Sequence, residues 1–463
     1  MNGGVKGFAE HPDIVQYLDR VCGQVKAKAM HEDIRNELLG HLEDLAEERK
    51  YHDNTSLEET VSDVLKQMGS PEEVGKGLHT AHKPKPEWSV IALVAGMVGI
   101  ALIILLNLSV DFPIKEDLLY GFIGISVMIA VYFADYRKLL RFSWQLYVIT
   151  LALLVVAHLI SLYLGYIAPD YATTESQMND FNRIYAQLFY LSPYLFLISF
   201  AGIFQLKRHD MQVKGMEIRS TNVKMIVSIL LPIIVYSHYA SLITFFSYCI
   251  GLVVLLLIAG YRKLLLSVSL SGALLMGLIL YIGSTPKGSH WIGIQGMLQH
   301  NLYYFTDGLN RGAGSISERS FRLLESAGMW GQGFGLNDIN TMMYPHNIEF
   351  QFTYAVHSLG WVFGIISILF VLFFIKRVLR MGIMLKDGYA RGLVIGLTTV
   401  LVLQYVWNIL MCLNIFPEGA PQLPLMNWSS LTVIFDFAVV GLMLSAYRRK
   451  DMYSHRQLSG SIE

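Results

Sequence analysis

Apolar residues along this chain come in ten blocks, each about as long as a bilayer is thick. The blocks cover residues 88 to 108, 117 to 135, 143 to 167, 186 to 206, 223 to 240, 242 to 260, 264 to 284, 348 to 375, 391 to 415 and 427 to 447. A helix needs about 20 apolar residues to cross the hydrocarbon core, where only helices and closed barrels satisfy their backbone groups. The pattern therefore predicts an all-α polytopic membrane protein with ten transmembrane helices.

The start of the chain follows another pattern, in which charged residues surround apolar positions spaced three and four residues apart. "SLEETVSDVLKQMG" opens with a capping box of Ser56 and Glu59, and "SPEEVGKGL" has Ser70 as the N-cap before a proline. We expect a small cytoplasmic helical bundle here. The predicted divisions are the bundle at 1–82, a linker at 83–87, a transmembrane domain at 88–450 and a cytoplasmic tail at 451–463.

Charge separates the loops into two sets. Those after the second, fourth, sixth, eighth and tenth blocks are basic, as in "DYRKLLR" and "YRRKDMYSHR", and they alternate with acidic or nearly neutral loops such as "SVDFPIKED". Short basic loops remain in the cytoplasm. We therefore expect a multi-pass protein of the cell membrane with both termini cytoplasmic. The polar start lacks an apolar signal region, so no cleavable signal peptide is expected.

Composition agrees with a membrane protein, since 53% of the 463 residues are hydrophobic and 16% are charged. Glu37 and His41 have a spacing that suits a shared metal, but an i,i+4 pair on a solvated helix face explains them more simply. Cys22, Cys249 and Cys412 show no metal-like spacing. We expect no disulfide, no protein-held metal and no nucleic-acid partner.

The longest predicted outer loop, residues 285–347, carries several cations. Arg311, Arg319 and Arg322 suit a lipid-linked phosphate or diphosphate, because guanidinium groups bind phosphate oxygens bidentately. A competing interpretation pairs Arg322 with Glu318 one helical turn away. Arg311 and Arg319 are therefore the better phosphate candidates.

"SERSFRLLESAGMWGQGFG" within this loop predicts an amphipathic interfacial helix followed by a glycine-rich turn. Its apolar residues Phe321, Leu324 and Trp330 are available to the membrane in this interpretation. The glycines permit positive φ and close backbone approach, and a turn is enough to explain them.

Glu349 stands at the mouth of the eighth block. An ionisable group there is costly unless it sits at the interface or faces a polar cavity, which makes it a functional-site candidate. His346, three residues earlier, lies at the same predicted interface. Further along, Gln404 and Asn408 are one turn apart and are predicted to bond between helices.

Four segments resemble the SEDS family (shape, elongation, division and sporulation), the group that contains RodA, FtsW and SpoVE. They are "SFRLLESAGMWGQGFG", which includes Ser320, "YPHNIEFQFTYAVHSLGWVFG", "QYVWNILMCLNIFPEGAPQLPLMNWSS" and "LVVLLLIAGYRKLLL". The order and spacing cover roughly residues 88 to 450. The family's Gln-Pro-Asp-Leu-Gly-Thr signature is missing at "YSHYASL", and Glu349 replaces its key aspartate, which indicates a remote member. The first 80 residues resemble the prefix domain found ahead of some bacterial permeases.

The resemblance implies a glycosyltransferase that polymerises lipid II or a related undecaprenyl-diphosphate-linked saccharide in peptidoglycan synthesis. Glu349 would be the catalytic base, while Arg311, Arg319, Arg322, His346 and Ser320 would bind substrate. A divalent cation, Mg²⁺ or Mn²⁺, is compatible with this chemistry. A single-span penicillin-binding transpeptidase is the implied partner, beside membrane lipid. Two alternatives stay open, a flippase for the same lipid and a non-catalytic scaffold.

Overall fold

The computed structural model describes residues 8–26, 31–52, 56–82, 86–108, 114–162, 175–214, 218–238, 242–283, 316–333, 348–416, 422–428 and 431–450. The chain forms two compact units, one of Met1–Pro86 with Arg448–Glu463 and one of Glu87–Tyr447. Each unit has its own packed interior, so each is described by itself.

The N-terminal unit is a bundle of short helices. Its helices are α2 (Pro12–Gln24), α3 (His31–His52), α4 (Leu57–Met68) and α5 (Pro71–His82). The predicted capping box of Ser56 and Glu59 is confirmed at the start of α4. Ser70 Oγ accepts from Glu73 N at 3.2 Å, which confirms the predicted cap before α5. The core is built from the apolar stripes, with Ile14, Val21, Leu42 and Val64 each fully buried.

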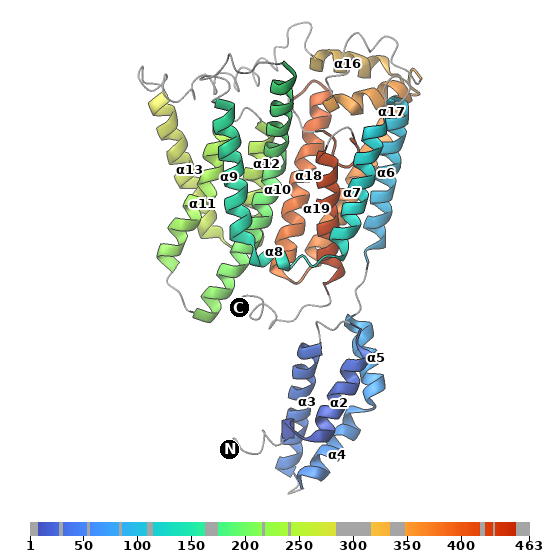
Figure 1. Ribbon diagram of the computed structural model, residues 1–463, viewed down its shortest axis with the longest axis vertical. Helices are drawn as coiled ribbons and strands as arrows, with labels where there is room; N and C mark the ends of the chain where they lie inside the picture. Colours follow the sequence, from blue (N-terminus) through green and yellow to red (C-terminus); the bar gives the residue numbers. More distant parts are fainter. Residues whose placement is uncertain are drawn as a thin grey trace. The chain divides into compact units, whose positions relative to one another are not determined.

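Each predicted span overlaps a helix among the described residues of the second unit (Figure 1). The helices are α6 (Trp88–Leu108), α7 (Lys115–Phe133), α9 (Ser143–Leu162), α10 (Glu175–Lys214), α11 (Ile218–His238), α12 (Leu242–Ile258), α13 (Arg262–Gly283), α17 (Gln351–Ile383), α18 (Gly388–Cys412) and α19 (Thr432–Arg448). Within the described ranges, six of them are long and apolar enough to cross a membrane, and α11 and α12 contain shorter apolar stretches. The predicted class, an all-α polytopic membrane protein, is confirmed.

α10, α18 and α19 are strongly buried helices of this unit. Of the apolar windows of α10 and α18, 72% and 61% is buried, against 11% for α7, and 13 of the 17 residues of α19 are buried. α18 packs against α10, α12 and α17, so it touches helices from the middle and the end of the chain. The polar side chains of Gln404 and Asn408 on α18 are buried, so they meet neighbouring helices.

The two ends of the bundle differ. The short helix α8 (Lys138–Arg141) crosses one end, and α16 (Ile316–Ser326) lies across the other (Figure 1). We call them the α8 end and the α16 end. Basic residues gather at the α8 end. They lie on or beside α8, near the starts of α13 and α18 and at the end of α17, and they are Arg137, Lys138, Arg141, Arg262, Lys263, Lys376, Arg377, Arg380, Lys386 and Arg391.

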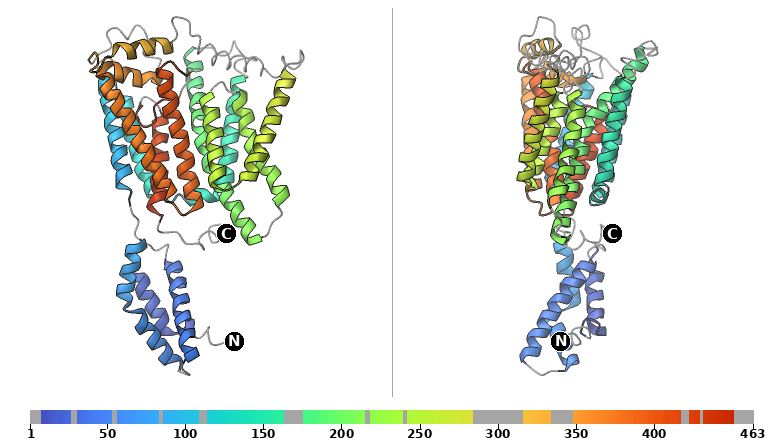
Figure 2. Two further views of the ribbon diagram at one scale, coloured as in Figure 1. Left: turned by 180° about the vertical axis from the view of Figure 1, so that it is seen from behind. Right: turned by 90° about the vertical axis from the view of Figure 1, so that its left-hand side faces the viewer.

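The eighth predicted span, a single helix over 348–375, is wrong in detail. A 3-10 turn, η4 (Ile348–Phe350), precedes α17, and α17 itself is broken at Gly360, where φ is 86° and ψ is 170°. The part before Gly360 lies across the α16 end, and the part after it runs through the bundle (Figure 2). We call residues 348–359 the Glu349 segment and Gly360 the elbow.

Candidate functional site

Glu349 is held through its backbone. Asn408 Nδ2 on α18 donates a hydrogen bond of 2.9 Å to the carbonyl oxygen of Glu349. Asn408 is fully buried, whereas Glu349 is only partly buried. The prediction that Asn408 bonds between elements is therefore confirmed. Because the anchor is the main chain, the carboxylate of Glu349 is left to other interactions.

A second anchor lies one turn further along α18 and involves three buried polar groups. Ser320 Oγ of α16 and Thr353 Oγ1 of α17 are 2.6 Å apart, and Ser320 also donates to the carbonyl oxygen of Cys412 at 3.1 Å. Ser320 and Thr353 have no exposed surface. Ser320 was predicted to bind substrate, but it is enclosed and joins α16 to α17 and α18. Its position supports the site without facing it.

A third anchor lies one turn below Asn408, at Gln404. Its Oε1 accepts from Tyr194 of α10 at 2.6 Å and from Tyr190 at 3.2 Å, which confirms the predicted interhelical role. Tyr190 also reaches Asp436 Oδ1 of α19 at 3.1 Å. Buried polar groups of this kind persist only when they find partners.

The three anchors share one face of α18. Residues 404, 408 and 412 are four apart, so they lie one above another along the helix. They hold, in turn, α10, the Glu349 segment and α16. The candidate site is therefore assembled on a single buried stripe of α18 at the α16 end.

The glycine-rich turn after α16 docks against the elbow. Gln332 N and Gly333 N donate to the carbonyl oxygens of His357 and Ser358 at 2.9 and 3.1 Å. In return, Trp361 N donates to Gly328 O at 3.1 Å. Gly331 and Gly333 adopt the positive φ that glycine permits, with φ of 79° and 93°, and Gly328 before them has φ 64°.

Only glycine fits at the contact itself. A Cβ on Gly331 would lie 2.2 Å from Ser358 O, and one on Gly360 would lie 2.2 Å from Met329 O. The close backbone approach foreseen for these glycines thus exists, although its partner, the elbow of α17, was not foreseen. This contact fixes the angle at which the Glu349 segment leaves the spanning part of α17.

The side chains on and just after α16 differ in exposure and in their partners. Arg322 Nη2 donates to Glu318 Oε1 at 2.6 Å, so the local pairing is present. Arg319 is exposed on the same helix. Leu324 was expected to be available to the membrane, but this is wrong, since it is 1% exposed and faces the bundle, whereas Trp330 is 82% exposed.

Two predicted substrate-binding residues, Arg311 and His346, lie outside the described residues. Of the others, the structure brings Glu349 and Ser320 onto the α18 stripe and puts Arg319 and Arg322 on the helix that Ser320 anchors. His357 lies on the Glu349 segment, with Nδ1 3.2 Å from Leu323 O. Through this contact it binds α16.

Sequence reasoning missed Thr353 and Asp436, and it did not predict the break at Gly360. Asp436 carried a usable signal, because a carboxylate inside an apolar span is rare and marks a functional or structural centre. Thr353 carried none, and a glycine by itself does not indicate a break, because threonine and glycine are common in spanning helices.

No family model matches the chain. It is 28% identical over 173 residues to a probable peptidoglycan glycosyltransferase FtsW of Lactococcus lactis, a stretch that covers 36% of this chain and 40% of that protein. A probable FtsW of Enterococcus hirae is 26% identical over 151 residues, which is 32% of this chain and 37% of that protein. The chain thus spans about two fifths of the length of these relatives.

A solved structure shares the fold at low identity. A chain of a peptidoglycan synthase complex, described as coordinating polymerization and crosslinking, is 18% identical with a TM-score of 0.54 and covers 79% of this chain and 98% of that one. Thermus thermophilus RodA, a rod shape determining protein, is 16% identical with a TM-score of 0.48 and covers 79% of this chain and 97% of RodA.

Proposed function

We propose that this chain is a remote member of the SEDS family and a peptidoglycan glycosyltransferase that polymerises lipid II or a related undecaprenyl-diphosphate-linked saccharide. The relatives matched by sequence carry the name of that activity. The observation that carries the proposal is the anchoring of the Glu349 backbone by Asn408 on a stripe that also holds α16. An acid on so firmly held a segment suits a reaction that depends on position.

Glu349 serves as the general base in this proposal. A sugar hydroxyl of one lipid-linked molecule attacks the anomeric carbon of another. The new carbon–oxygen bond forms as the bond from that carbon to the lipid diphosphate breaks, and the hydroxyl proton passes to the Glu349 carboxylate. The leaving diphosphate keeps the bonding electron pair. A positioned base of this kind typically contributes about 10²- to 10⁴-fold in rate.

The cations of the loop before Glu349 would bind the diphosphate. Arg319 is exposed on α16, the helix that Ser320 fixes to α18. Arg322 is paired with Glu318 on the same helix. The proposal gives the diphosphate to Arg311, Arg319 and Arg322 together, and a contact with sugar or phosphate to His346.

A divalent cation remains part of the proposal. Among the described residues there is no group of three His, Cys, Asp or Glu side chains arranged to hold a metal. Mg²⁺ commonly binds through one or two carboxylates and substrate phosphates rather than through a complete protein cage. A cation would therefore enter with the diphosphate, where it would neutralise charge.

The orientation follows from charge. The basic residues gather at the α8 end, and short basic loops face the cytoplasm. The α16 end would then face outward, where lipid II is polymerised, and both termini would be cytoplasmic. The structurally similar chain comes from a synthase complex, which supports a single-span penicillin-binding transpeptidase as partner.

The test is polymer formation by purified protein from purified lipid II, with and without a transpeptidase partner. The proposal predicts glycan chains from the wild type and none from Glu349→Ala at equal folded concentration. Retained polymerisation by the variant, or movement of lipid II across proteoliposomes without polymer, would contradict it. Cysteine labelling from each side of sealed vesicles tests the orientation separately.

A further inference from the structure

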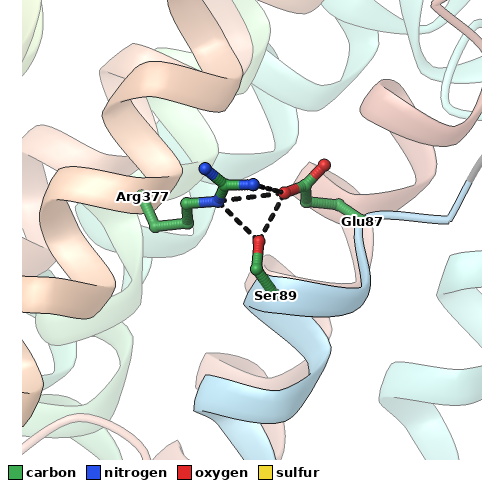
Figure 3. A network of polar contacts seen from close by, with 3 residues as sticks. All are labelled: Glu87, Ser89 and Arg377. Atoms are coloured by element: carbon green, nitrogen blue, oxygen red, sulfur yellow. Dashed lines mark hydrogen bonds and ion pairs between the residues drawn. The ribbon is translucent and has the colours of Figure 1, made fainter.

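The residue at which the chain enters the second unit is clamped to α17. Arg377 donates to Glu87 Oε1 from Nη2 at 2.6 Å and from Nε at 3.0 Å, and its Nε also reaches Ser89 Oγ at 2.5 Å (Figure 3). Ser89 bonds the same Glu87 oxygen, which closes the triangle. We call Glu87, Ser89 and Arg377 the clamp.

The clamp is better formed than an ordinary surface ion pair. The Glu87 side chain is 13% exposed and that of Arg377 is 35% exposed. Burial acts to raise the pKa of Glu87, but hydrogen bonds from Ser89, Tyr447 and Arg377 and the nearby guanidinium charge together lower it below the ordinary value. The carboxylate therefore remains ionised at neutral pH.

Glu87 has a second role that makes the clamp a junction. Its carbonyl oxygen accepts from Val90 N and Ile91 N, each at 3.1 Å, so it begins α6. The residue directly before it, Pro86, ends the N-terminal unit. Any force or rotation that reaches the bundle through the linker therefore passes through Glu87 first.

The other end of α17 carries the Glu349 segment. Between the elbow and Ile383, α17 has no further break, since Gly360 is its only residue with non-helical φ and ψ. From Trp361 to Arg377 this rod is about 24 Å long at 1.5 Å per residue. Trp361 N and Val362 N bond the carbonyl oxygens of Gly328 and Met329. One continuous helix thus joins the clamp to the contact that sets the Glu349 segment.

We propose that the clamp couples the N-terminal helical unit to the Glu349 segment through α17, so that this unit regulates the outer site. A partner that binds the helical unit and pulls on the linker shifts Glu87, and α17 carries the shift to the elbow. Coupling of this kind is reciprocal. A ligand at the Glu349 segment therefore changes the affinity of the helical unit for its partner by the same factor as the partner changes the affinity for that ligand. The conformational coupling between the clamp and the elbow does not depend on which reaction the site performs.

The variants are chosen so that only the clamp changes. Glu87→Gln removes the ionic contact and keeps the size of the side chain, and Ser89→Ala is a milder alternative if the first variant folds poorly. Lys376→Gln is the matched control, because Lys376 is an exposed cation one residue from Arg377 on the same helix. The exchanged pair Glu87→Arg with Arg377→Glu tests for rescue.

The measurement is amide hydrogen exchange in nanodiscs by mass spectrometry, on peptides that cover Trp361 and Val362. Glu87→Gln is expected to speed exchange there at least fivefold, Lys376→Gln to leave it unchanged, and the exchanged pair to restore it. A purely local role would instead speed exchange only at Val90 and Ile91, and that result overturns the proposal. A general loss of stability would show equally in buried peptides of α18.

Polymerisation assays on the same variants separate this inference from the proposed function. If Glu87→Gln speeds amide exchange at the elbow but neither the wild type nor any variant makes polymer, the coupling stands and the proposed reaction fails. If polymer forms at wild-type rate in Glu87→Gln while exchange at the elbow is unchanged, the proposed function stands and coupling fails.

Discussion

Replacing the elbow glycine by alanine should damage the protein more than the same change at Gly328 of the docked turn. Gly360 has φ 86° and ψ 170°, a region that only glycine occupies readily. Its missing Cβ would lie 2.2 Å from Met329 O and 2.5 Å from Gly331 N. Both neighbours are backbone atoms, so neither can move away as a flexible side chain does.

The size of the effect follows from two contributions. Holding a non-glycine residue in that region costs about 1 to 3 kcal/mol. Relieving the overlap stretches the bonds from Trp361 N and Val362 N, now 3.1 and 3.2 Å long, and each is worth about 0.5 to 1.5 kcal/mol. Gly360→Ala should therefore lower the free energy of unfolding by about 2 to 6 kcal/mol in mixed micelles.

Gly328 provides the matched control. It has φ 64° with no atom within 4 Å of an added Cβ, so Gly328→Ala meets only the left-handed strain of about 1 to 2 kcal/mol. Both variants should be measured by chemical unfolding and by polymerisation per folded molecule. If Gly360→Ala is no less stable and no less active than Gly328→Ala, the docked elbow does not fix the Glu349 segment.

Three further variants test the other contacts. Ser320→Ala leaves Thr353 Oγ1 buried without this partner and should lower the free energy of unfolding by about 1 to 3 kcal/mol, whereas Ser326→Ala at an exposed position should lower it little. Equal losses of stability in both variants would refute the role of the Ser320–Thr353 contact. Asn408→Leu removes the bond to the Glu349 carbonyl and should cut polymerisation at least tenfold at constant folded concentration; an unchanged rate would show that this bond does not position the acid. The pKa of Glu87 is lowered in the folded protein, so its ionised carboxylate stabilises the fold at pH values above its ordinary pKa of about 4.3. This stabilisation is lost as the pH falls through the folded pKa. The difference in unfolding free energy between wild type and Glu87→Gln should therefore be constant above about pH 5 and shrink below it.

The spanning helices could be predicted because length and hydropathy decide them. Each of the ten predicted blocks overlaps a helix among the described residues, since a bilayer leaves the backbone few alternatives. The same argument failed at 348–375, where composition is apolar throughout but a single glycine breaks the helix. Hydropathy averages over a window, so it does not register one residue whose conformation is set by a neighbour 29 positions earlier in the chain, Gly331.

The candidate site was only partly predictable for a related reason. Gln404 and Asn408 were recognised because polar residues one turn apart in a span need partners, and the structure supplies Tyr194 and the Glu349 carbonyl. The role of Ser320 depends on α17 and α18 meeting above it, which no local pattern encodes. Tertiary contacts, rather than the motif itself, decide whether a hydroxyl faces substrate or interior.

The central claim is that the acid anchored by Asn408 takes the proton of an attacking sugar hydroxyl. The most direct measurement is the rate of lipid II polymerisation by purified protein carrying Glu349→Gln or Glu349→Asp, each compared with wild type at equal folded concentration. The account predicts a loss of at least 100-fold for Glu349→Gln, which cannot accept the proton, and measurable activity for Glu349→Asp, which can. A Glu349→Gln variant that polymerises at the wild-type rate would contradict it.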